Sequence, residues 1–324
     1  MKRSLRLIPA LAALLILSAC GGKKVSSAEP FVPRKFPPAP TAPSMMTDRN
    51  EITEYIITNY WNDFLEGDYH CDSSYVNGVA SEDVESALGM YVTLLENGCS
   101  REFATKAMEG FAGKVEEYGE NHPSSNVFSF FEEMVRKYLY DPNSPVRDED
   151  LFLPYVARLA ESKLVSEEKK AGYSFDARMC SLNQVGTKAA DFTFTDLSGK
   201  RYNLYGIEAP YTLLFFTNPG CPSCKEIVES LTRNEEITNL AKNGVIAVVN
   251  VYIDLDREKW RALAKEYPDY WYNGYDQDYA IRQDISYNVR GIPSLYVLDE
   301  DKRVIMKDAP AEKAIPFLQN IQKQ

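Results

Sequence analysis

The first half of the chain contains apolar residues that recur every three or four positions. Between residues 50 and 182 this spacing predicts about six α-helices, because it places apolar side chains on one face of each helix. The predicted helices cover roughly 52–64, 81–97, 100–121, 126–139, 150–163 and 167–182. Candidate N-caps are Ser81, Ser100 and Ser166, and Gly98 is a candidate stop. We therefore expect an all-α domain of antiparallel helical hairpins.

After Gly186 the pattern changes to that of short strands. Alternating residues at 192–195 and 201–204 predict a hairpin. Further strands are predicted at 212–216, 245–252, 294–298 and 303–306, with helices at about 221–233, 257–267 and 311–322. Strands that alternate with helices and then end in an antiparallel pair indicate a mixed sheet with helices on both faces. An α/β domain is therefore expected over residues 184–324.

The first 20 residues have the features of a lipoprotein signal peptide. Three basic residues precede an apolar run, residues 7–17, which is too short to span a bilayer as a helix. The run ends in Leu17-Ser-Ala-Cys20, which fits the bacterial lipobox, with Cys20 as the lipidated residue. We expect a chain anchored in the bacterial cell envelope and facing the periplasm. Gly21 is not an inner-membrane retention acid, which favours the outer membrane; an ordinary signal peptide cleaved elsewhere is the alternative.

Residues 21–49 carry six prolines and no apolar periodicity. Such a composition favours extended conformations, so this segment is predicted to be a tether. A structured arm is the alternative interpretation.

Composition narrows the classes of function. A chain of 324 residues with 44% hydrophobic residues is long enough for two folded domains. Its net charge of −11 argues against nucleic acid as a partner. The chain has only two histidines, His70 and His122, which leaves little room for a His-based metal site or triad. No metal or cofactor is expected.

The candidate chemistry lies in Cys221-Pro-Ser-Cys224, at the junction of a predicted strand and a predicted helix. Two cysteines with this spacing can close a small, reducible disulfide. The helix N-terminus carries partial positive charge, which favours a thiolate at the first sulfur. The pair therefore supplies an attacking sulfur and a resolving one.

Together with Gly291-Ile292-Pro293, where a proline opens a strand, this motif resembles the thioredoxin fold over about residues 184–324. The leading hairpin and the segment Gly186-Thr-Lys-Ala-Ala-Asp-Phe192 most resemble those of TlpA/ResA-like proteins of the AhpC/TSA-like branch. The resemblance implies that Cys221 attacks and Cys224 resolves. It also implies that Pro293 is a cis-proline beside the disulfide and that the Ile292 backbone pairs with an extended substrate.

The sequence departs from thioredoxins at several positions. Phe215 stands where they usually have a buried acid, Gly220 where they usually have tryptophan, and Asp308 near a frequent glycine. The missing acid leaves proton handling unassigned. Asp254 and Asp256 follow a predicted strand and are candidates, with solvated loop carboxylates as the alternative.

Other interpretations of the cysteine pair are weaker. Zinc would need two further ligands, and no second CxxC exists. A peroxidase would need Pro and Thr or Ser at fixed positions before its cysteine, and neither Cys221 nor Cys224 has them. A non-catalytic thioredoxin module stays open.

The remaining residues that could have a chemical role also have purely structural interpretations. Cys71 and Cys99 are a candidate structural disulfide, which would leave Cys180 free or paired intermolecularly. All three could equally be small buried apolar residues. The aromatic cluster 270–275 is expected to be a loop packed on the sheet, with a client-binding wall as the alternative.

The sequence thus predicts a lipid-anchored thiol–disulfide oxidoreductase that acts on protein or peptide thiols and is reduced again by a membrane electron donor. The alternative is a non-catalytic binding or scaffold lipoprotein with a vestigial thioredoxin module.

Overall fold

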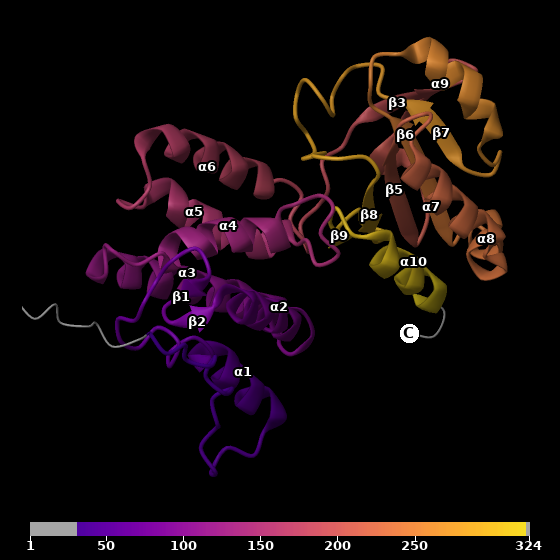
Figure 1. The fold of residues 1–324 in the computed structure, drawn as a ribbon. Coiled ribbons are helices and arrows are strands. Elements are labelled where there is room, and N and C mark those ends of the chain that lie inside the picture. The colour runs from indigo at the N-terminus through magenta and orange to yellow at the C-terminus, as the bar shows by residue number, and fades with distance from the viewer. Residues whose placement is uncertain (1–30, 322–324) are drawn as a thin grey trace, which may run out of the picture. The chain divides into compact units, whose positions relative to one another are not determined.

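The structure is a computed structural model that describes residues 31–321, shown as a ribbon in Figure 1. The predicted signal peptide, Cys20 and residues 21–30 of the predicted tether lie outside the described residues. From Pro33 on, the described residues belong to one compact unit.

Six helices form between residues 49 and 180, as the apolar spacing predicts. They are α1 (Arg49–Asn59), α2 (Ser81–Asn97), α3 (Arg101–Asn121), α4 (Val127–Leu139), α5 (Glu149–Glu161) and α6 (Glu167–Cys180). Trp61 lies at the centre of their core, with its ring centroid 5.1 Å from that of Phe111 and 5.0 Å from that of Phe131. Ser100 caps α3 by accepting the Phe103 amide at 3.2 Å, and Gly98 ends α2, as expected.

The structure differs from the expected N-cap of α2 and adds two further features in this region. Ser81 is the first helical residue of α2 and Ala80 is its N-cap, with no side-chain hydrogen bond. The helical domain also contains a short antiparallel hairpin of β1 (Tyr75–Val76) and β2 (Val79–Ala80). The described part of the predicted tether packs on the helices: the Phe36 ring stacks on Phe64 at 5.5 Å.

The second half forms a seven-stranded mixed sheet in the order β4-β3-β7-β6-β5-β8-β9. The strands are β3 (Thr193–Asp196), β4 (Arg201–Asn203), β5 (Tyr211–Thr217), β6 (Ile246–Tyr252), β7 (Tyr272–Tyr275), β8 (Ser294–Leu298) and β9 (Val304–Met306). The central strand β5 runs parallel to β6 and antiparallel to β8. Helices α7 (Pro222–Arg233), α8 (Glu235–Lys242), α9 (Arg257–Leu263) and α10 (Ala311–Asn320) complete the domain, with 3₁₀ turns at Leu204–Gly206 and Ala264–Glu266.

The two faces of the sheet are covered differently. Helices α7, α8 and α10 supply Ile227, Leu240 and Leu318 to the core on one face. In the described chain, the core on the opposite face takes its side chains from strands, from the 3₁₀ residue Leu204 and from connecting segments, and none from an α-helix. The expectation of helices on both faces is therefore met on one face only.

Helix α8 and strand β7 were not predicted from the sequence. The aromatic cluster 270–275 was expected as a loop, but its second part is β7, which pairs in parallel with β6 and antiparallel with β3. Trp271 and Tyr275 are buried there, so they belong to the core rather than to a client-binding wall. Within residues 31–321, no helix combines the length and apolar character needed to cross a membrane.

Candidate active site

Strand β5 leads directly into the cysteine pair. After Thr217 the chain turns through Gly220, whose φ of +80° lies in the region that favours glycine. Cys221 is the N-cap of α7, and Pro222 occupies the first helical turn, where its missing N–H costs nothing. Seven buried or half-buried residues of β5 thus fix the position of a helix N-terminus, and the helix carries both sulfurs.

The two sulfurs lie together but in different surroundings. Cys221 Sγ accepts a hydrogen bond from the backbone N–H of Cys224 at 3.2 Å. Cys221 is half-buried, whereas Cys224 is only 2% exposed. Burial, and then hydrogen bonding to Cys221, raise the pKa of Cys224 to about 12. The first thiol is thus accessible and the second is a protonated, shielded thiol.

The segment around Pro293 lies beside these sulfurs. The Ile292–Pro293 peptide bond is cis, as the resemblance implied. The Cys221 thiol is 3.8 Å from the Ile292 carbonyl oxygen and is oriented to donate to it. Ile292 and Pro293 are half-buried and thus partly accessible beside Cys221. The structure brings together all four residues predicted for the site; their catalytic and substrate-binding roles stay predictions.

A buried polar ladder that the sequence did not predict lies on the sheet face that carries Cys224. Thr217 donates to Asn250 at 2.6 Å, and Asn250 donates to Asn273 at 3.0 Å, across strands β5, β6 and β7. Asn250 pairs in register with Phe215, so the ladder lies on the sheet face that also carries Cys224. Phe215 itself is fully buried, and no acid occupies its place. This ladder therefore consists of neutral polar groups.

A cavity of about 580 Å³ opens on both cysteines from the side of Tyr267 and Pro268. Asn273 donates to the Pro268 carbonyl at 2.8 Å and so ties this wall to the polar ladder. Burial raises the pKa of Tyr267, while hydrogen bonding to Thr217 and Asn250 opposes that shift. The raised pKa keeps the Tyr267 hydroxyl neutral at physiological pH.

The two carboxylates considered for proton handling lie apart from the sulfurs. Asp254 accepts a hydrogen bond from the Asn218 side chain and pairs with Arg282 at 2.6 Å. It therefore supports the turn before Cys221 without touching the cysteine. Asp256 caps α9 by accepting the Lys259 amide at 3.0 Å. A Cβ on Gly220 would lie 3.4 Å from Lys259 Nζ, so a cation lies beside that turn.

The other cysteines do not form the expected bridge. Cys71 and Cys99 are free thiols: Cys71 Sγ is 3.5 Å from Ser125 Oγ, and Cys99 Sγ donates to the Leu95 carbonyl at 3.5 Å. The candidate disulfide is therefore a wrong prediction in this structure. Cys180 is fully buried, and burial raises its pKa well above the usual value.

The histidines take structural positions. His70 contacts Asp72 at 2.8 Å, and His122 ends α3 with its ring stacked on Tyr118 at 4.2 Å. Over the described residues, no group of three His, Cys, Asp or Glu side chains could hold a metal ion.

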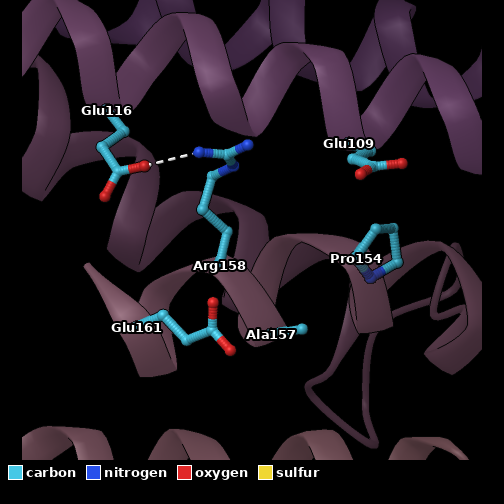
Figure 2. A pocket seen from close by; sticks show the side chains of 6 residues that line it. All are labelled: Glu109, Glu116, Pro154, Ala157, Arg158 and Glu161. Atoms are coloured by element: carbon cyan, nitrogen blue, oxygen red, sulfur yellow. Dashed lines mark hydrogen bonds and ion pairs between the residues drawn. The ribbon is translucent and has the colours of Figure 1, made fainter.

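A second concavity, of about 470 Å³, lies between α3 and α5 (Figure 2). Arg158 of α5 is drawn towards Glu116 of α3 and pairs with it at 2.6 Å. Glu109 and Glu161 also line the hollow. It contains no nucleophile, and we assign it no chemistry.

Comparisons with known proteins agree with this architecture. A family model described as "Domain of unknown function (DUF5106)" matches residues 20–183, and one described as "Thioredoxin-like" matches residues 210–304. The comparison with curated proteins found no match.

Solved structures extend the likeness. The crystal structure of a thioredoxin-like protein from Bacteroides caccae is 31% identical, with a TM-score of 0.76, and the match covers 88% of this chain and 98% of that one. The C-terminal domain of an uncharacterized protein from Bacteroides fragilis is 38% identical, with a TM-score of 0.41, over 42% of this chain and 97% of that one. The thioredoxin domain of a thiol-disulfide oxidoreductase from Bacteroides vulgatus is 22% identical, with a TM-score of 0.36, over 42% of this chain and 98% of that one. The chain belongs to the thioredoxin-like family, with a helical DUF5106 domain ahead of its thioredoxin-like domain.

Proposed function

We propose that this protein is a thiol–disulfide oxidoreductase that exchanges disulfides with protein or peptide clients through Cys221 and Cys224. One arrangement carries the proposal: a half-buried sulfur at a helix N-terminus, a shielded second sulfur hydrogen-bonded to it, and the Ile292 carbonyl 3.8 Å from the first sulfur. Cys221 is the more exposed of the two residues, which supports attack by Cys221 and resolution by Cys224.

In the reducing direction, the Cys221 thiolate attacks one sulfur of a client disulfide. The client S–S bond breaks, its second sulfur leaves as a thiolate and takes up a proton, and a mixed disulfide remains. Cys224 then loses its proton and attacks Cys221 Sγ, which releases the first client sulfur. Two electrons pass from the dithiol to the client, and the reverse sequence oxidises a client dithiol.

Trapping of the mixed disulfide tests this function. Cys224→Ser removes the resolving sulfur, so clients should accumulate on Cys221 and be released by dithiothreitol. The matched control is the double variant Cys221→Ser/Cys224→Ser, which should trap nothing. Absence of Cys221-dependent adducts, together with full function of the double variant in cells, would favour the scaffold alternative.

The direction of electron flow can be measured on the purified protein. A reduction potential of about −270 mV would identify a reductant, and one of about −120 mV an oxidant. A membrane electron donor is proposed for the reducing case, because each turnover leaves the pair oxidised.

We further propose that lipidated Cys20 holds the protein in the bacterial envelope, with the outer membrane favoured. A Cys20→Ala variant should move from the membrane fraction to the soluble periplasmic fraction. Unchanged membrane association, together with no lipid mass on Cys20, would contradict the anchor.

A further inference from the structure

The first residues of α5 lie in a buried cluster of charges with residues next to the Ile292–Pro293 pair. The cluster contains three carboxylates and three cations: Arg147, Glu149, Asp150, Arg290, Lys307 and Asp308. The side chains of Glu149 and Lys307 are 1% and 3% exposed. Since burying charges is costly, such a cluster is weak evidence of net stabilisation.

Glu149 is the main link between the helical region and the segment 290–294. Its Oε1 accepts hydrogen bonds from Arg290 Nε at 2.7 Å and from Asn288 Nδ2 at 2.8 Å. Its Oε2 is 3.1 Å from Lys307 Nζ. Arg290 Nη2 also donates to Asp308 at 2.9 Å, so Arg290 joins Glu149 to Asp308.

Packing adds a second contact with the same segment. Pro142, in the loop before α5, is so close to Gly291 that a Cβ built there would be 3.1 Å from Pro142 Cβ. The Arg290 guanidinium also lies 4.1 Å from the Tyr140 ring centroid. Residues of the helical region thus contact Arg290 and Gly291, the two residues immediately before Ile292.

We propose that the start of α5, through Glu149, positions the segment 290–294 against Cys221. The DUF5106 domain would then help to shape the redox site. This inference rests on the proposed function. A client chain whose sulfur reacts with Cys221 must lie along this segment, because the Ile292 carbonyl is the neighbour of that sulfur. Glu149 is a positioning residue, since it acts through Arg290 and touches neither sulfur.

Two probes of different size separate positioning from general damage. In the Cys224→Ser background, formation of the mixed disulfide at Cys221 is followed by mass spectrometry. One probe is the disulfide dimer of an extended eight-residue peptide, which must lie along the segment. The other is 2-hydroxyethyl disulfide, which is too small to depend on it. Each reaction forms one protein–probe S–S bond, breaks the probe's own S–S bond and releases one thiol.

Glu149→Gln should slow the reaction with the peptide about tenfold, because misplacement of a binding group lowers the rate without altering the nucleophile. The reaction with the small disulfide should stay within about twofold. The matched control is Glu116→Gln. Glu116 of α3 pairs with Arg158 of α5 and does not contact the segment 290–294 (Figure 2). It should leave both rates unchanged.

Two outcomes would overturn the inference: an unchanged peptide rate in Glu149→Gln, or an equal loss with both probes. If the Cys224→Ser parent reacts with neither probe, the proposed function itself fails, and the inference with it. Glu149→Gln leaves buried cations uncompensated, so a second variant, Glu149→Gln/Arg290→Met, removes one charge of each sign. We expect it to regain thermal stability while the peptide rate stays low; recovery of the peptide rate would contradict positioning.

Discussion

The Asp308 carboxylate and the Ser294 hydroxyl are joined by a buried hydrogen bond of 2.7 Å. The same carboxylate accepts a hydrogen bond from Arg290, so one side chain holds both ends of the segment 290–294. The backbone φ of Asp308 is +42°, in the left-handed region where glycine is common and Asp and Asn are tolerated. Asp308, a departure from the thioredoxin pattern, thus keeps a glycine-type backbone and adds a carboxylate.

Asp308→Asn should lower the free energy of unfolding by about 3 kcal/mol, because it leaves Arg290 and Arg147 short of a negative charge inside the protein. Asn tolerates the same backbone angle, so the effect reports the charge. Urea denaturation measures it. The control Asp301→Asn, at an exposed turn, should change the value by less than about 0.5 kcal/mol. Equal values for both variants would contradict this account.

The pKa of Cys224 predicts the pH dependence of the resolving step. Burial raises this pKa to about 12, so the thiol is protonated through the neutral range and its thiolate fraction grows with pH. Release of a preformed Cys221–client disulfide should therefore accelerate about tenfold per pH unit from about pH 6 to 9. Stopped-flow or quenched mass spectrometry gives the rate. The Cys224→Ser variant should lack this phase, and a plateau below pH 9 would contradict the raised pKa.

The same shift fixes the sign of a stability effect. A folded-state pKa above the ordinary value of 9.0 means that the folded dithiol binds the Cys224 proton more tightly than the unfolded chain does. This contribution to stability is complete below pH 9 and is lost as the pH rises towards 12. Reduced wild-type protein should therefore lose more stability than Cys224→Ser between pH 8.5 and 10.5 in thermal unfolding. Parallel curves for the two proteins would rule this out.

Local patterns were enough to predict much of the fold. Strand β8 forms over residues 294–298, as predicted, because a proline opens an unbroken run of buried residues. Strand β7 was missed because Asn273 and Gly274 favour a loop. The structure needs glycine there: a Cβ on Gly274 would lie 2.5 Å from the Phe194 ring and 2.9 Å from the Thr195 carbonyl. This requirement comes from the contact with β3, which local sequence does not show.

The candidate site likewise contains residues that the sequence identifies and residues that it does not. Cys221, Cys224, Ile292 and Pro293 belong to short motifs, so the sequence alone identified them. Glu149 and Arg290 lie 141 positions apart, and neither belongs to a motif. Thr217 and Asn250 are likewise joined only by the register of β5 and β6. Long-range polar pairs of this kind leave no periodic signal in the chain.

Removal of the Thr217 hydroxyl tests the polar ladder. Thr217→Val keeps the shape but leaves the buried Asn250 carbonyl without its donor, which should cost about 1–3 kcal/mol of unfolding free energy. Urea denaturation of the reduced protein measures the loss. The control is Thr232→Val, whose hydroxyl bonds only to the backbone of its own helix and should cost less than about 1 kcal/mol. A neutral Thr217→Val would mean that the ladder contributes little.

Labelling of thiols tests the correction at Cys71 and Cys99. Because each thiol has its own partner, iodoacetamide should label Cys71 in the folded oxidised protein, and both residues after unfolding without reductant. Peptide mapping by mass spectrometry gives the result. Cys99→Ser should leave the labelling of Cys71 unchanged, whereas a Cys71–Cys99 cross-linked peptide would restore the rejected disulfide.

Phe36 makes the Pro-rich segment part of the fold. Its ring lies 5.7 Å from Trp61 and stacks on Phe64, and both partners are buried. Phe36 is only half-buried, so Phe36→Ala should cost about 2 kcal/mol, less than truncation of a fully buried phenylalanine. Met45→Ala, a control in the same segment with an 86% exposed residue, should be close to neutral. Thermal unfolding compares the two variants. If Phe36→Ala is as neutral as Met45→Ala, residues 34–48 act as the tether that their composition predicts.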